Sequence, residues 1–129
     1  MKIKGPFDVQ LNPLPNHLES ANGIQMGHMS IAKNYSGDLS ATGRGEMLSA
    51  MTETQGSAGY VAIEQVEGVL EGKSGSFVLQ HFGIMNRGED RLVLEVIPDS
   101  GTGELMGLTG KMSIVQTENQ HSYEFEYDL

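Results

Sequence analysis

The chain has 129 residues, with neither cysteine nor tryptophan, and its 8 basic and 17 acidic residues give a formal charge of −9. This length suffices for one domain with a buried core, so we expect a single domain over residues 1–129. The negative charge disfavours nucleic acid and anionic membranes as partners, and the lack of cysteine excludes thiol catalysis and fits the cytoplasm.

Alternating apolar and polar residues predict β-strands along most of the chain. In the first run, Ile3, Phe7 and Val9 share one face while Lys4 and Asp8 share the other, which is the period of a half-buried strand. The same pattern, interrupted by turn residues, continues to the end of the chain. The predicted strands are 2–11, 24–35, 39–54, 57–70, 76–86, 91–97, 111–117 and 121–129.

Between these runs, the connections are short or rich in glycine. The polar segment His17 to Gly23 has no periodicity and is predicted to be a surface loop, and a turn is predicted from Glu118 to Gln120. Four glycines fall within residues 99–110, between the sixth and seventh strands. Glycine permits a positive φ and close backbone approach. We therefore expect residues 99–110, the glycine joint, to close one end of the sheet.

The strand pattern predicts an all-β fold, a closed eight-stranded antiparallel barrel. Closure removes exposed strand edges, and such a barrel is just wide enough to be filled by side chains or to hold one small ligand. Gly43 and Gly45 share one side of the third strand and indicate a bend there. Residues 60–63 and 77–79 are apolar on both faces, so we expect both faces to be covered, most simply by a homo-oligomer interface outside the barrel.

Five segments resemble a bacterial family of small proteins of unknown function. These segments are Gly45–Ala50, Gly56–Ala62, Gly75–His81, Pro98–Leu105 and His121–Phe125. The resemblance implies a barrel of the allene oxide cyclase type, and it makes the glycine joint similar to a glycine-rich turn of those cyclases and of dirigent proteins. A shared fold does not carry a shared reaction. The resemblance therefore assigns no catalytic residue.

Short motifs of known chemistry are incomplete in this chain. Asp99-Ser100-Gly101-Thr102 is similar to the catalytic turn of aspartic proteases, but Pro98 precedes it and such a turn is common between strands. The segment Gly68 to Ser74 has three spacer residues where a phosphate-binding loop has four, and a strand follows it instead of a helix. We predict neither a protease nor a nucleotide-binding protein.

Metal binding has little support in the residue spacing. The histidines are far apart in the sequence, and no His-x-His pair occurs. A zinc or iron ion held by His28, Glu46, Glu64 and His81 is the alternative. We expect no metal and no cofactor.

The candidate ligand-binding residues are polar residues on strands that look buried: Glu46, Tyr60, Glu64, Gln80 and His81. Desolvation inside a narrow barrel would raise the pKa of a glutamate and make it a candidate general acid or base, while a histidine exchanges protons near neutral pH. In the alternative interpretation, Glu46 and Glu64 point to solvent, and Gln80 and His81 lie at an interface or strand end.

From these features we predict that the barrel binds a hydrophobic or amphipathic small molecule in its lumen. Two further functions remain open. One is an enzyme of the isomerase or cyclase kind, which rests on the resemblance of the fold, and the other is a structural module for homo-oligomerisation without a ligand. Catalytic residues are unassigned, and whether the chain is an enzyme stays open.

Overall fold

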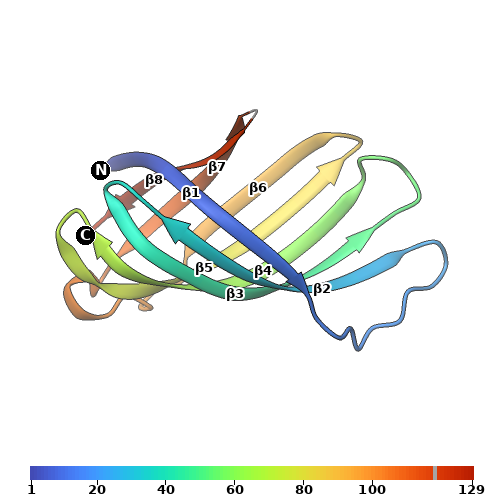
Figure 1. The fold of residues 1–129 in the computed structure, drawn as a ribbon, viewed down its shortest axis with the longest axis horizontal. Coiled ribbons are helices and arrows are strands. Elements are labelled where there is room, and N and C mark those ends of the chain that lie inside the picture. The colour runs from blue at the N-terminus through green and yellow to red at the C-terminus, as the bar shows by residue number, and fades with distance from the viewer. Residues whose placement is uncertain (118) are drawn as a thin grey trace.

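The chain forms a closed barrel of antiparallel strands in a computed structural model that describes residues 1–117 and 119–129. Each strand pairs with the next along the chain, and β8 returns to pair with β1 (Figure 1). The strands are β1 (Lys2–Pro13), β2 (Gln25–Tyr35), β3 (Leu39–Met51), β4 (Ala58–Leu70), β5 (Lys73–Asn86), β6 (Glu89–Val96), β7 (Thr109–Thr117) and β8 (Gln120–Asp128). The predicted fold class is confirmed.

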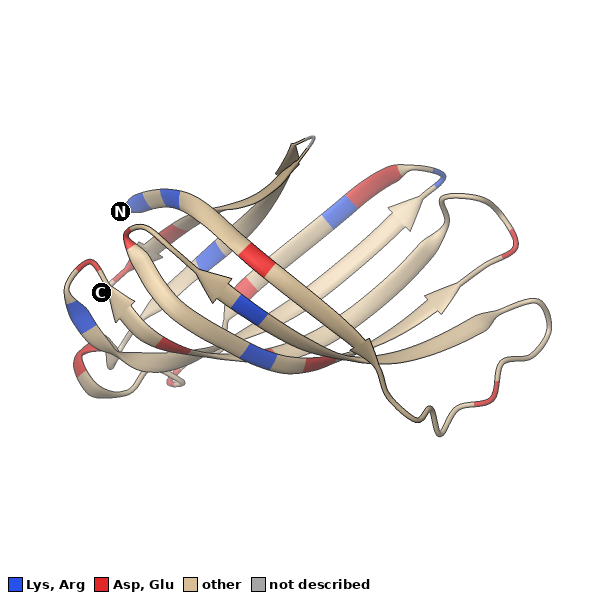
Figure 2. Cartoon of the chain, viewed as in Figure 1, with Lys and Arg blue, Asp and Glu red and all other residues tan. Residues whose placement is uncertain are grey.

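The predicted strand ends differ from the observed ends by at most three residues. The turn predicted from Glu118 to Gln120 includes residue 118, which lies outside the described residues. Acidic residues recur in the connections between strands (Figure 2). Asp38 lies in the turn between β2 and β3, and Glu71 lies in the turn between β4 and β5. Within the described part of the chain, no helix has the length and apolar character needed to cross a membrane.

The pairing register decides which side chains enter the barrel. Lys33, Gly43, Val66 and Phe77 are cross-strand neighbours on β2 to β5, and all four are buried. Because successive residues of a strand point to opposite faces, every second residue from these positions also faces inward. The alternation that predicted the strands therefore also separates the interior from the outer surface.

One end of the barrel is filled by side chains. The 3-10 helix η1 (Gly103–Leu105) lies within the glycine joint and carries Leu105 into the interior. Leu105 and Leu108 are each 1% exposed and belong to the same core cluster as Phe77. These side chains and the rest of the core cluster occupy this end of the barrel.

Glycines shape the backbone of the glycine joint. Gly103 and Gly107 have φ values of 60° and 87°, in the region that other residues rarely adopt. A Cβ atom on Gly110 would lie 2.6 Å from the carbonyl oxygen of Glu126. The prediction that this joint closes one end of the barrel is confirmed by its backbone and by the two buried leucines.

The opposite end, here called the open half, is reached by solvent. Several of its inward-facing apolar side chains are only partly buried, and among them are Val9, Met29, Met47, Leu92 and Ile114. Because these side chains point inward, their partial exposure means that solvent enters the barrel here.

The pairing between β6 and β7 is short. It consists of two residue pairs, Leu94 with Met112 and Glu95 with Lys111, whereas β7 and β8 pair from Thr109 to Thr117.

Candidate functional site

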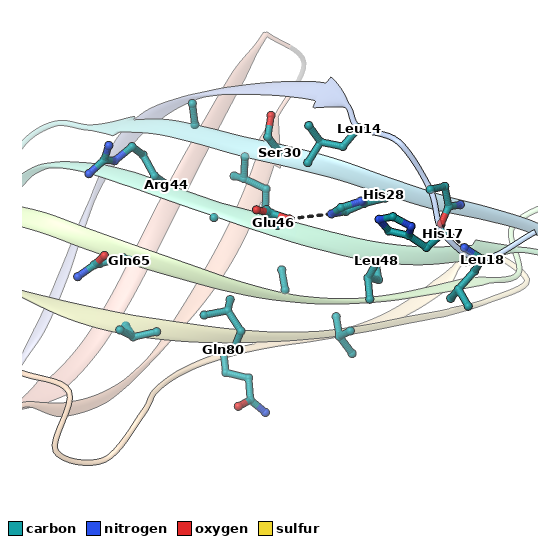
Figure 3. A pocket seen from close by; sticks show the side chains of 18 residues that line it. Leu14, His17, Leu18, His28, Ser30, Arg44, Glu46, Leu48, Gln65 and Gln80 are labelled. Carbon is teal, nitrogen blue, oxygen red and sulfur yellow. Dashed lines mark hydrogen bonds and ion pairs between the residues drawn. The ribbon is translucent and has the colours of Figure 1, made fainter.

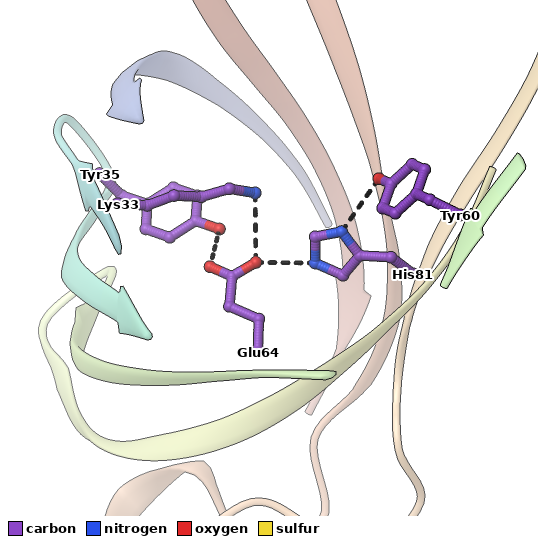
Figure 4. A network of polar contacts seen from close by, with 5 residues as sticks. All are labelled: Lys33, Tyr35, Tyr60, Glu64 and His81. Atoms are coloured by element: carbon purple, nitrogen blue, oxygen red, sulfur yellow. Dashed lines mark hydrogen bonds and ion pairs between the residues drawn. The ribbon is translucent and has the colours of Figure 1, made fainter. Parts of the chain in front are cut away.

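Three of the five candidate residues meet inside the barrel. Glu64 and His81 are 0% and 3% exposed, and Tyr60 is half-buried. Tyr60 and Glu64 share the inward parity of Ala62 on β4, and His81 on β5 lies directly opposite Ala62. These three residues belong to a network of polar contacts inside the barrel (Figure 4).

Glu46 and Gln80 lie on the outer surface, which corrects the expectation that they line the lumen. Glu46 precedes the inward-facing Met47, and Gln80 precedes the inward-facing His81, so a step of one residue along the strand reverses the direction of the side chain. The alternative interpretation is thus right in placing Glu46 outside. It is wrong for Glu64, which is buried.

Glu64 is the centre of the network. Its Oε1 lies 2.8 Å from Nε2 of His81 and 3.1 Å from Nζ of Lys33, and its Oε2 accepts the hydroxyl proton of Tyr35. Burial alone would raise the pKa of Glu64, but the hydrogen bond from His81 and the Lys33 ammonium outweigh burial and hold that pKa below its usual value. The carboxylate is therefore charged at neutral pH, which corrects the expected upward shift.

Two members of the network, Lys33 and Tyr35, were missing from the sequence-based candidates. Lys33 is 7% exposed, and its ammonium lies 5.1 Å from the centroid of the Phe7 ring and 5.6 Å from that of Tyr35. A buried ammonium needs a counter-charge, which Glu64 provides. The sequence holds a sign of this pair, because Lys33 alternates with Ile31 and Tyr35 on the apolar face of its strand.

Two glycines make room for these side chains. A Cβ atom on Gly43 would lie 2.0 Å from Oε2 of Glu64, and one on Gly83 would lie 2.4 Å from Cε1 of Tyr60. Either methyl group would force the polar side chain to move. The bend predicted at Gly43 from the sequence thus coincides with the space that the Glu64 carboxylate occupies.

The hydrogen bond to Glu64 selects the tautomer of the neutral His81 ring. Its Nε2 faces the Glu64 carboxylate and so carries a proton, while Nδ1 lies 3.1 Å from the Tyr60 hydroxyl. In the neutral ring, Nδ1 accepts the proton of that hydroxyl. Burial, followed by the charge of Glu64, raises the pKa of Tyr60 to about 12, so the phenol stays protonated. Since its one proton points to His81, the Tyr60 oxygen offers only lone pairs to the open half.

A second hollow lies outside the barrel. This outer groove has a volume of about 1290 Å³ and is bounded by outward side chains of β2 to β5 and by the loop at residues 14–18 (Figure 3). In the groove, His28 Nδ1 lies 2.9 Å from the Pro15 carbonyl oxygen, and His28 Nε2 lies 2.7 Å from Oε1 of Glu46. Both partners are acceptors, so both hydrogen bonds form only when the ring is protonated to the imidazolium. The bonds to Pro15 and then Glu46 raise the pKa of His28.

The two histidine–glutamate pairs do not combine into a metal site. His28 and Glu46 lie on the outer surface, whereas Glu64 and His81 lie inside the barrel. Among the residues that the structure describes, no three His, Asp or Glu side chains are grouped so that they could hold a metal ion. The alternative of a zinc or iron ion held by all four residues is wrong.

Comparisons with known proteins give a family without an assigned activity. The family described as "Protein of unknown function (DUF3224)" matches residues 3–127. A crystal structure of a DUF3224-family protein of unknown function from Shewanella oneidensis MR-1 is 53% identical, with a TM-score of 0.98, and the match covers 100% of this chain and 96% of that chain. Among curated proteins, the comparison found no match.

Proposed function

Because the chain belongs to the DUF3224 family, whose description assigns no function, we propose from the site itself that this protein binds an amphipathic small molecule in the open half of its barrel. The observation that carries the proposal is the position of Tyr60. It joins the buried Glu64–His81 pair to the open half, where inward apolar side chains remain partly exposed.

The open half supplies an apolar wall for such a molecule. Four of its inward-facing side chains are partly exposed: Met29, Met47, Leu92 and Ile114. A ligand that covers them would gain about 25 cal/mol of binding free energy for each Å² of apolar surface removed from water. Methionine side chains are flexible and adapt to differently shaped ligands. The filled end of the barrel restricts the ligand to this half, which narrows the original prediction of a site in the lumen.

The polar end of the ligand follows from the hydrogen bonds around Tyr60. With His81 neutral, the phenol directs its proton to Nδ1 of His81, and its oxygen has lone pairs left to accept a hydrogen bond. A hydroxyl or N–H group on an apolar body is the matching chemistry. The ligand is neutral, because the charges of Glu64 and Lys33 already balance each other.

Acid–base catalysis is the second candidate function, and the tautomer of His81 favours it. If Tyr60 takes a proton from a bound hydroxyl group while passing its own proton to Nδ1 of His81, the resulting imidazolium is stabilised by the Glu64 carboxylate. The resemblance to the allene oxide cyclase type of barrel directs this candidate toward isomerase or cyclase chemistry. It requires that the bound molecule be chemically changed, which mass spectrometry of the released ligand detects.

The composition of the chain bears on its compartment and on its classes of partner, whichever of the two functions applies. The formal charge of −9 and the lack of cysteine support a protein of the cytoplasm that associates with neither nucleic acid nor anionic membrane. A neutral small molecule is not repelled by this charge, so the proposed ligand class is compatible with the composition.

A matched pair of fluorescent probes tests the binding proposal. We expect 2-naphthol to bind more tightly than naphthalene by about 2-fold to 10-fold, which is the contribution of one hydrogen bond. Tyr60→Phe should remove this difference. Tyr127→Phe is the control, because Tyr127 is buried in the core cluster and its hydroxyl bonds to Glu71. If neither probe binds, or if Tyr60→Phe leaves the ratio of the two affinities unchanged, the proposed site is refuted.

A further inference from the structure

A row of exposed apolar side chains crosses the outer surface of β3 to β6. Leu48, Val61, Phe82 and Val93 are direct cross-strand neighbours, and they are 45%, 53%, 45% and 41% exposed. Ile63, two residues along β4, is 50% exposed. We call these five residues the outer apolar row. Together they leave on the order of 400 Å² of contiguous apolar surface, a size that marks interaction sites on soluble proteins.

The outer apolar row has two differently shaped parts. Leu48, Val61 and Ile63 line the outer groove, whereas Phe82 and Val93 lie beyond it on β5 and β6. In a two-fold interface the same patch faces itself, so residues beyond the groove on one copy meet the groove of the other. A patch that holds both a hollow and side chains suited to fill that hollow fits a second copy of itself.

The charge around the outer apolar row also fits a second copy. The outward charged residues within four positions of the row are Arg44 and Arg91 against Glu46, Glu67, Glu89 and Glu95, and Glu46 is already paired with His28. The flank is therefore close to balance, whereas the whole chain carries −9. Two copies that repel each other elsewhere on their surfaces can approach at this place with less repulsion.

We propose that two copies of this chain form a two-fold dimer through the outer face of β3 to β6, with Phe82 of each copy in the outer groove of the other. A standard interface buries about 800 Å² on each partner, of which somewhat more than half is apolar. The outer apolar row supplies most of that apolar share, and Leu14 and Leu18 at the rim of the groove supply the rest. The dimer also covers the second apolar face that the sequence predicts for β4 and β5.

This dimer is independent of the proposed ligand site. The outer apolar row points away from the barrel interior, while Tyr60 and His81 point into it. Loss of the dimer therefore leaves the open half unchanged, and failure of the naphthol experiment says nothing about the dimer.

A pair of valine substitutions tests the interface. Val61 lies in the outer apolar row, while Val115 on β7 is also outward-facing, 40% exposed, and outside that row. We expect the wild-type protein to sediment at twice the chain mass of 14.0 kDa. Val61→Lys should raise the dimer dissociation constant by about 30-fold or more, as for a central interface residue, and Val115→Lys should leave it unchanged.

Phe82→Gln is a second disruptive variant, in case Val61→Lys disturbs the sheet. Far-UV circular dichroism and the melting temperature establish that each variant is folded. A wild-type protein that sediments as a monomer up to several hundred micromolar overturns the proposal. It is equally overturned if folded Val61→Lys or Phe82→Gln dimerises as tightly as Val115→Lys.

Discussion

Replacing Glu64 by glutamine tests whether the buried network is held together by charge. Glutamine has the size of glutamate, so the space beside Gly43 still accommodates it, but the substitution removes the negative charge that faces Lys33. The ammonium, with its side chain 6% exposed, then has no counter-charge among the buried residues that the structure describes. The hydrogen bond to His81 also loses its charged acceptor.

The expected effect is large, because a buried ion pair broken on one side costs about 3–5 kcal/mol. For a chain of this size that corresponds to a fall in melting temperature of roughly 10–20 °C. The double variant Lys33→Met/Glu64→Gln should recover most of the loss, since it removes both charges and leaves an apolar side chain against Phe7. If Glu64→Gln destabilised the protein for a reason other than the lost charge, adding Lys33→Met would not restore the free energy of unfolding.

Urea unfolding followed by far-UV circular dichroism measures these free energies. The pH dependence provides a second readout, because the folded pKa of Glu64 lies below its usual value of 4.5. The stabilisation by the carboxylate is therefore complete above pH 4.5 and is lost as the pH falls through the folded pKa. This acid-dependent loss should be smaller in Glu64→Gln than in the wild type.

Two results would refute the reasoning. The first is a loss of less than 1 kcal/mol in Glu64→Gln, which would mean that Lys33 finds another partner or reaches water. The second is a double variant that is as unstable as the single one, which would mean that the carboxylate acts through hydrogen bonds alone. The control is Glu67→Gln on the outer face of β4, where the glutamate is exposed and the expected change is within 0.5 kcal/mol.

Two further predictions concern the loop beside the outer groove and the filled end of the barrel. The pKa of His28 should lie above 6.5, and it should fall in the Glu46→Gln variant. NMR titration of the ring protons measures this pKa. A value at or below 6.5 would show that the ring does not donate from both nitrogens. Since this folded pKa is raised, the attachment of the loop at Pro15 is complete below pH 6.5 and weakens as the pH rises through the folded pKa. Leu105→Ala should lower the free energy of unfolding by about 2–5 kcal/mol, as measured by urea titration. The control is Met106→Ala, because Met106 is exposed and its replacement should change that free energy by less than about 0.5 kcal/mol. Equal effects of the two substitutions would mean that Leu105 does not fill the end of the barrel.

Periodicity and turn residues predicted the strands, and the need to remove exposed strand edges led from the strands to a barrel. Each strand alternates between core and solvent, and glycines and short polar turns mark where the strands end. The same parity also separates Glu64 from Glu46, because Glu64 alternates with Ala62 and Val66, whereas Glu46 alternates with Arg44 and the outward Leu48. The two glutamates were nevertheless treated alike, because the apolar neighbours of Glu46 were counted without regard to face.

The network around Glu64 could not be assembled from the sequence in the same way. Lys33 and Glu64 lie on strands that are not paired with each other, and Gly43 stands between them in the register. Their contact depends on the curvature of β3 and on the absence of a side chain at Gly43, which the alternation pattern does not encode. The direction of the Glu64 pKa shift depends on the hydrogen bond from His81 and on the Lys33 ammonium, since burial alone would raise this pKa.

The closing pair of strands has a consequence for folding. The other pairings join strands that are consecutive in the chain, but β1 and β8 come from opposite ends, and the Met1 amino group bonds to the Tyr127 carbonyl oxygen across 126 positions of sequence. Loop-closure entropy grows with chain separation, so sealing the barrel is the entropically costliest contact. Joining the two ends by a short linker and opening the chain in another turn would make this contact local and transfer the cost to a different pair of strands.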